Sequence, residues 1–263
     1  MLPNPQQCHA LASEWINAFN HSLTAAPQSL AAAAHLFLAD SYWRDALGVT
    51  WPLDTMVGSD AIFAALRDNA ARVGLSDLAL DDTASPPQWV NRAGTYAIEA
   101  FFRFETKAAI GRGIVRLCPT TKPTEAGNTD RQWRAWTLFT AIDQLKGHEE
   151  KLDRNRPTGS SYSRDFRGPN WLDKRLAAQK YEDRDPAVLV VGGGQAGLSI
   201  AARLTQLGID NLIVDKNNRI GDNWRNRYHA LTLHNQLHVN HLPYMPFPPT
   251  WPTYIPKDML ALW

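Results

Sequence analysis

The chain has 263 residues, 44% of them hydrophobic and 20% charged, a composition typical of a soluble globular protein with one large domain or two ordinary ones. Its 27 basic and 26 acidic residues leave a net charge of +1, which argues against nucleic-acid binding and polybasic membrane attachment. Two cysteines without a CxxC spacing argue against a disulfide framework or a cysteine zinc site. The N-terminus lacks the basic and apolar regions of a secretory signal, so we expect a cytoplasmic protein.

Residues 1–146 are expected to form an α+β domain. Apolar residues at helical spacing predict a helix around Trp15–Leu23, and Leu36 and Phe37 are also expected to be helical. Another helix is predicted to run to about Arg72, with Asp60 as its N-cap.

The hydrophobic period then changes to two. Three alternating runs, at 96–105, 110–117 and 133–142, predict long strands of a curved antiparallel sheet against which the helices pack. The polar stretch 119–131 is expected to be a hairpin loop.

Residues 147–186 are predicted to be a linker, because they are polar and rich in Gly, Pro and Ser. Within them, Asn170 is expected to cap a short helix from Trp171 to about Tyr181. Asp185 and Pro186 then interrupt the chain before a strand.

Residues 187–263 begin with the pattern of a βαβ unit. A continuous apolar run at 187–191, typical of a strand buried on both faces, leads directly into the G-x-G-x-x-G turn 192–197. A helical pattern follows to Gly208, and a second apolar run ends at Asp215. This order predicts an incomplete Rossmann-type unit that binds a dinucleotide.

The glycines of this turn have separate expected roles. Gly192 permits the tight turn, Gly194 lets the backbone approach a pyrophosphate, and Gly197 allows the helix to pack closely on the strand. The helix N-terminus offers partial positive charge to the phosphates. Asp215 is placed to accept a hydrogen bond from a ribose hydroxyl and to repel a 2′-phosphate, which favours FAD or NAD over NADP.

Four motifs follow Asp215 in order: GDNW at 221–224, LTLH at 231–234, LPYMPFP at 242–248 and WPTYIPK at 251–257. With the glycine turn, they make residues 168–263 resemble class B flavin-dependent monooxygenases, especially the flavin-containing branch that includes indole-3-pyruvate monooxygenases. The resemblance implies that the FAD pyrophosphate is cradled by Gly192, Gly194, Gln195, Ala196 and Gly197. It also implies that the adenosine ribose meets Asp215 and Lys216, and that the path toward the isoalloxazine is lined by Gly221, Asn223 and Trp224, with His234 nearby.

The family reaction implied by this resemblance uses NADPH to reduce FAD. O2 then adds at the flavin C4a, and the hydroperoxide passes one oxygen atom to a small organic substrate. No catalytic side chain is assigned, and the substrate is not specified. The chain has no second G-x-G-x-x-G for NADPH, and family members continue well beyond the WPTYIPK segment, so we expect a truncated monooxygenase that lacks the NADPH domain.

Two alternatives stay open. The chain could be a non-catalytic binding or dimerisation module that remains from such an enzyme. It could also be an NAD-dependent enzyme, although the GDNW and WPTYIPK segments have no use in a plain NAD domain.

The N-terminal half resembles the nuclear transport factor 2-like cone, in which helices wrap around a curved sheet. The segments that carry this resemblance are SYWRDALGVTW at 41–51 and GSDAI at 58–62. The resemblance implies a homodimer formed through the open sheet face. The partners expected for the whole chain are thus a small-molecule substrate and a second copy, with no nucleic acid or membrane.

Four histidines, His229, His234, His238 and His241, fall within one short window. On a helix three of them would share a face, which suggests a metal site. Prolines nearby break any helix, and no carboxylate ligand lies among the histidines, so we favour loop histidines and expect no metal.

Overall fold

The computed structural model describes residues 2–24, 33–123, 129–158 and 165–263. It divides the chain into two compact units, Met1–His148 and Glu149–Trp263. Within the described ranges, every helix is too short or too polar to cross a bilayer.

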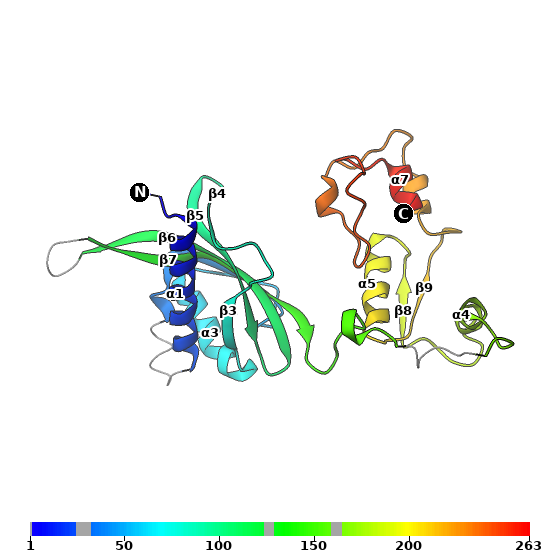
Figure 1. The fold of residues 1–263 in the computed structure, drawn as a ribbon, viewed down its shortest axis with the longest axis horizontal. Helices are drawn as coiled ribbons and strands as arrows, with labels where there is room; N and C mark the ends of the chain where they lie inside the picture. The colour runs from blue at the N-terminus through cyan, green and yellow to red at the C-terminus, as the bar shows by residue number, and fades with distance from the viewer. Residues whose placement is uncertain (1, 25–32, 124–128, 159–164) are drawn as a thin grey trace. The chain divides into compact units, whose positions relative to one another are not determined.

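In its described part, the first unit packs helices α1 (Pro5–Thr24) and α3 (Ser59–Val73) on one face of a curved, seven-stranded sheet (Figure 1). The strands are β1 (Phe37–Ala46), β2 (Thr55–Val57), β3 (Ser76–Leu80), β4 (Gln88–Arg92), β5 (Thr95–Glu105), β6 (Ala109–Pro123) and β7 (Thr129–Leu145). Their order is β2-β1-β7-β6-β5-β3, and β4 also pairs with β5. This architecture confirms the predicted α+β fold.

The three long strands predicted from alternation are β5, β6 and β7. The predicted loop at 119–131 was too long, because β6 and β7 stay paired from Pro119↔Trp133 to Pro123↔Thr129. Backbone pairing continues past the end of the hydrophobic alternation, since ladder hydrogen bonds do not require apolar side chains. Residues 124–128 lie outside the described ranges.

The expectation of helical structure at Leu36 and Phe37 is wrong, because Phe37 begins strand β1. Along β1 the side chains of Phe37, Ser41, Trp43 and Asp45 are buried, and the period of two from Ser41 onward fits a strand. β1 pairs parallel with β7 and antiparallel with β2, so the sheet is mixed instead of fully antiparallel.

Helix α3 lies where the sequence predicts it, but Asp60 is not its N-cap. Gly58 holds that position with a φ of 87°, a backbone angle that L-residues rarely adopt, and Asp60 lies in the first turn. Asp60 still stabilises the helix there, since an acidic side chain complements the helix dipole.

Aromatic rings fill the core between the helices and the sheet. Trp15, Phe19 and Phe37 contact one another with ring centroids 5.1–5.9 Å apart. On the sheet, the ring of Phe104 lies over Gly111, where an added Cβ would come within 2.0 Å of the ring. The interior of this unit is therefore packed as a core, and the glycine on β6 makes room for the ring.

The second unit contains the predicted βαβ segment (Figure 1). Its helices are α4 (Trp171–Gln179), α5 (Gln195–Gln206), α6 (Asp222–Arg225) and α7 (Lys257–Leu262), with short 3-10 helices η1 (Asp153–Asn155) and η3 (Leu237–Val239). Strands β8 (Val188–Val191) and β9 (Asn211–Val214) pair in parallel on either side of α5 in the sequence. Asn170 caps α4 as predicted, in a capping box with Asp173.

Strand β8 differs from the expectation of burial on both faces. Val188 and Val190 are half-buried, whereas Leu189 is 55% exposed and Val191 82% exposed. Helix α5 contacts β8 and β9, and within the described residues no other layer buries Leu189 and Val191.

The first residues of the second unit are held against α5. The Glu150 carboxylate accepts hydrogen bonds from Arg203 Nη1 at 2.7 Å and from the Tyr244 hydroxyl at 2.5 Å. The Lys151 N–H donates to the Gln206 carbonyl at 2.8 Å, near the C-terminus of the helix. Residues placed in the linker by sequence therefore contribute contacts to the Rossmann-like unit.

Candidate functional site

The turn between β8 and α5 requires its first and last glycines for different reasons. Gly192 has a φ of 109°, which L-residues rarely adopt. A Cβ on Gly197 would lie 1.8 Å from the Gly192 carbonyl oxygen, so this helix residue touches the preceding backbone directly. Gly194 is the N-cap of α5, and a Cβ there would meet only Asn223 Nδ2, at 3.5 Å. The turn is thus tightly packed at Gly197, whereas at Gly194 there is space beside the backbone.

Asp215, at the end of β9, is bound to this turn. Its Oδ2 accepts a hydrogen bond from the Gly193 N–H at 2.6 Å, and its Oδ1 accepts one from the Asn217 N–H at 2.7 Å. These bonds, the one from Asn217 first, hold the pKa of the Asp215 carboxyl below its usual value. The carboxylate is exposed and ionised at neutral pH, and the positive charge of Lys216 acts in the same direction.

The segment after Asp215 returns to the glycine turn. Gly221, with a φ of 88°, is the N-cap of the short helix α6. Ile220 Cδ1 lies 3.2 Å from the position of a Cβ on Gly193, and the Asn223 amide approaches Gly194 in the same way. Of the residues chosen from sequence, the structure therefore gathers the glycine turn, Asp215, Gly221 and Asn223.

For three other residues chosen from sequence, the structure gives no contact with the glycine turn. Lys216 and His234 are exposed, and Trp224 is half-buried with the guanidinium of Arg227 5.4 Å from its ring centroid. His241 accepts a hydrogen bond on Nδ1 from the Phe247 N–H at 2.9 Å, within an aromatic cluster that includes Trp251 and Trp263. Across the described ranges, no group of three or more His, Cys, Asp or Glu residues is placed to hold a metal ion.

Sequence reasoning missed two basic residues that hold α6. Arg225, the last residue of α6, donates to Asp222 Oδ1 at 2.9 Å and to the Ile220 carbonyl at 2.8 Å. Lys257, the first residue of α7, is only 6% exposed and donates to the Arg225 carbonyl at 3.1 Å. Arg225 directly follows the GDNW motif, and Lys257 is the last residue of the WPTYIPK motif. Nothing in either motif indicates that these two residues lie close together.

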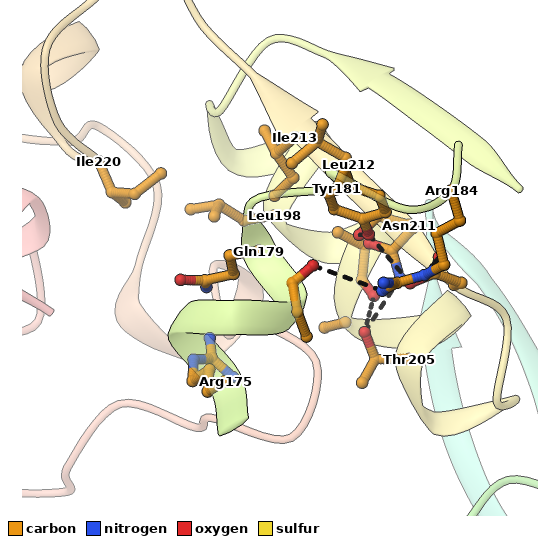
Figure 2. Close-up of a pocket in the computed structure, with 14 residues that line it drawn as sticks. Arg175, Gln179, Tyr181, Arg184, Leu198, Thr205, Asn211, Leu212, Ile213 and Ile220 are labelled. Carbon is orange, nitrogen blue, oxygen red and sulfur yellow. Dashed lines mark hydrogen bonds and ion pairs between the residues drawn. The ribbon is translucent and has the colours of Figure 1, made fainter. Parts of the chain in front are cut away.

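A crevice of about 610 Å³ lies between α4, α5 and β9 (Figure 2). At one end the hydroxyl of Tyr181 donates to Asp210 Oδ1 at 2.9 Å, and Arg184 Nε lies 3.3 Å from Asp210 Oδ2. Leu198 and Ile220 line the part away from these polar groups (Figure 2). Because Ile220 Cδ1 also lies 3.2 Å from the position of an added Cβ on Gly193, the crevice adjoins the glycine turn.

Residues 190–247, which include the glycine turn, Asp215 and α6, match the family described as NAD(P)-binding Rossmann-like domain. The second unit therefore contains a Rossmann-like segment. The match begins within β8 and ends before α7, so Lys257 lies outside it.

Curated relatives match the same part of the protein. Over 91 residues the chain is 33% identical to indole-3-pyruvate monooxygenase YUCCA1 of Oryza sativa subsp. japonica, which is 34% of this chain and 22% of that protein. Over 74 residues it is 45% identical to an uncharacterized oxidoreductase, CzcO-like, of Geobacillus kaustophilus, which is 28% of this chain and 21% of that protein. These matches confirm the resemblance to monooxygenases, and the chain spans about a fifth of the length of these relatives.

Solved structures match the first unit. A nuclear transport factor 2-like superfamily protein from Salmonella enterica has a TM-score of 0.34 at 16% identity, over 55% of this chain and 96% of that chain. A steroid delta-isomerase from Pseudomonas aeruginosa has a TM-score of 0.31 at 14% identity, over 56% of this chain and 87% of that chain.

Proposed function

We propose that the second unit binds FAD and belongs to a monooxygenase that uses NADPH and O2 to oxygenate a small organic substrate. The observation that carries this proposal is the glycine turn at the N-terminus of α5, with the Asp215 carboxylate bound to the Gly193 N–H at 2.6 Å. The similarity to monooxygenases supports the assignment of the reaction class.

The turn fits a pyrophosphate. The first amides of a helix have no acceptor within the helix, so those at Gln195–Gly197 are suited to phosphate oxygens. Beyond the neighbouring backbone, the nearest atom to a Cβ placed on Gly194 is Asn223 Nδ2 at 3.5 Å, so the backbone is accessible where a phosphate would approach. The ionised Asp215 favours a ribose hydroxyl and disfavours a 2′-phosphate, which supports FAD or NAD over NADP in this turn.

The bound flavin would supply hydride acceptance and oxygen chemistry, while the protein binds and orients it. We assign Gln195, Ala196 and the turn glycines to the pyrophosphate, and Asp215 and Lys216 to the ribose. Gly221, Asn223, Trp224 and His234 are proposed to line the path toward the isoalloxazine. No side chain is assigned to proton transfer, and none to NADPH.

Ligand titration of the 263-residue chain tests this proposal. FAD, NAD and NADP would be titrated separately, followed by calorimetry and, for FAD, by the change in flavin fluorescence. We expect FAD to bind most tightly. Preferential binding of NADP, or no binding of FAD, would contradict the assignment.

We also infer a second function, self-association of the cone, from the open sheet face of the first unit. Tyr42, Ile114 and Phe139 line a groove of about 450 Å³ there, with Arg44 and Arg116 beside them. Tyr42 is 43% exposed and Phe139 39%, so apolar surface is available for a second copy. Sedimentation equilibrium of the parent chain and of Phe139→Arg tests it. A dimer that the substitution dissociates supports the inference, and a monomeric parent contradicts it.

A further inference from the structure

Helices α6 and α7 cap each other. In any helix the last carbonyl groups lack a partner within the helix. The Arg225 carbonyl at the end of α6 accepts a hydrogen bond from Lys257 Nζ at 3.1 Å, and Lys257 is the first residue of α7. The Ala261 carbonyl near the end of α7 accepts one from Arg225 Nη2 at 2.5 Å. Each helix thus supplies the cation that satisfies the C-terminal carbonyl of the other.

The side chains of Lys257 and Arg225 are largely buried. The Lys257 side chain is 7% exposed and that of Arg225 is 21% exposed, so both cations depend on protein acceptors in place of water. Lys257 also lies 3.1 Å from Asp258 Oδ1, and Arg225 Nη1 lies 2.9 Å from Asp222 Oδ1. Replacing Lys257 would remove the donor to the Arg225 carbonyl, and replacing Arg225 would remove the donor to the Ala261 carbonyl.

The backbone around α6 leaves little freedom for another arrangement. A Cβ on Gly221 would lie 2.3 Å from the Ala261 carbonyl oxygen, so α7 presses directly on the N-cap of α6. Arg225 Nη1 also donates to the Ile220 carbonyl at 2.8 Å, just before that N-cap. Helix α7 therefore contacts the N-cap of the helix that follows Ile220 and contains Asn223.

We propose that Lys257 and Arg225 are positioning residues of the dinucleotide site, which through the mutual capping of α6 and α7 hold Ile220 and Asn223 against Gly193 and Gly194. Neither cation contacts the glycine turn itself. Their effect passes through Ile220, 3.2 Å from the Cβ position on Gly193, and through the Asn223 amide beside Gly194. The inference rests on the proposed binding of FAD in that turn.

The test compares Lys257→Met and Lys257→Arg in the full 263-residue chain. Methionine has a similar length but cannot donate to the Arg225 carbonyl, whereas arginine keeps the charge and the donors. Lys174→Met, on the exposed surface of α4, is the matched control. FAD affinity is measured by fluorescence titration, and amide hydrogen exchange is measured without flavin.

We expect Lys257→Met to weaken FAD binding about tenfold or more, Lys257→Arg to restore most of the affinity, and Lys174→Met to change it less than twofold. Without flavin, Lys257→Met should speed exchange at the α6 amides of Trp224 and Arg225, which bond to the Gly221 carbonyl, and at the Gly193 amide. Exchange in α5 should stay as in the parent, which distinguishes a local change from unfolding of the unit.

Unchanged FAD affinity in Lys257→Met would overturn the inference, and so would unchanged exchange at α6. Faster exchange spread equally over α5 and α6 would also overturn it, because Lys257 would then act only on global stability. A parent chain that fails to bind FAD would contradict the proposed function itself. If the parent binds FAD and the methionine variant binds it equally well, only the inference fails.

Discussion

The N–H of Gly193 donates a hydrogen bond to Asp215 Oδ2 at 2.6 Å and so joins the glycine turn to the end of the second strand. This bond holds the carboxylate at the mouth of the turn while Asn217 binds its other oxygen. A single acidic residue therefore bonds to the turn and places an ionised carboxylate beside it.

Asp215→Ala should weaken FAD binding by about tenfold or more, because it removes the proposed ribose acceptor and the acceptor for the Gly193 N–H. The pKa of Asp215 is held below its usual value, so the parent should bind FAD with nearly constant affinity between about pH 5 and 8. Fluorescence titrations across that range check both statements. Equal affinity in the alanine variant would show that Asp215 does not contact the ligand.

Gly197→Ala should lower the stability of the unit, whereas Gly194→Ala should lower only its affinity for the ligand. At Gly197 the new Cβ would overlap the Gly192 carbonyl oxygen, so we expect the turn itself to be displaced and the unit destabilised. At Gly194, with φ near −80°, alanine fits the free protein and should weaken only ligand binding. Circular dichroism melting and FAD titration separate the two effects. A Gly194→Ala variant that melts as early as Gly197→Ala would contradict this distinction.

Glu99→Gln should destabilise the first unit by about 1–2 kcal/mol at pH 7, a modest value because its partners remain partly hydrated. The Glu99 carboxylate receives hydrogen bonds from Arg92 at 2.7 Å and Arg116 at 2.8 Å, and the Arg92 bond is the main cause of its lowered pKa. Glu105→Gln, in a half-exposed pair with Lys146, is the control and should cost only a few tenths of a kcal/mol.

The same ion pair predicts how stability changes with pH. Because the folded pKa of Glu99 lies below the unfolded value, its contribution is full above about pH 4.5 and is lost as pH falls through the folded pKa. Denaturant unfolding should be measured at pH 7 and in acid. Between these two conditions, the free energy of unfolding should fall less for Glu99→Gln than for the parent. Parallel losses in the two proteins would contradict this assignment.

Thr140→Val should destabilise the first unit by about 1–3 kcal/mol. The Thr140 hydroxyl donates to Asp45 and accepts a hydrogen bond from Trp43 Nε1 at 2.8 Å, and all three residues are buried. Valine has nearly the same shape but leaves both partners with one bond fewer. Thr137→Val, on the half-buried open face, should change the unfolding free energy by less than about 0.5 kcal/mol.

The sequence allowed the βαβ unit and the three long strands to be predicted, because each depends on a local period or on glycines at fixed spacing. Strand β1 was misread at its start, where Leu36 and Phe37 follow an alanine-rich run that favours helix. The N-cap at Gly58 was missed because N-caps are usually predicted from side chains that can accept a hydrogen bond. Gly58 has no such side chain and occupies the position because of its positive φ.

The basic residues around α6 could not be predicted for a different reason. Arg225 and Lys257 are separated by 32 residues, and no periodicity links them. Their meeting depends on the path of the intervening chain, where the Leu231 carbonyl accepts the Lys257 N–H and the Ile255 carbonyl accepts the Leu233 N–H. Contacts of this kind follow from tertiary packing, which a single sequence does not display.

The contacts of Glu150 affect where the chain should be joined when one of its two units is exchanged for that of another protein. A chimera that replaces the first unit and is joined at 148/149 keeps the carboxylate shared by Arg203 and Tyr244. A chimera joined at 186/187, where the glycine-rich motif suggests a natural start, discards it and leaves Arg203 on α5 without that acceptor. The donor fragment for any such graft should therefore begin about forty residues before the first strand of the Rossmann-like segment.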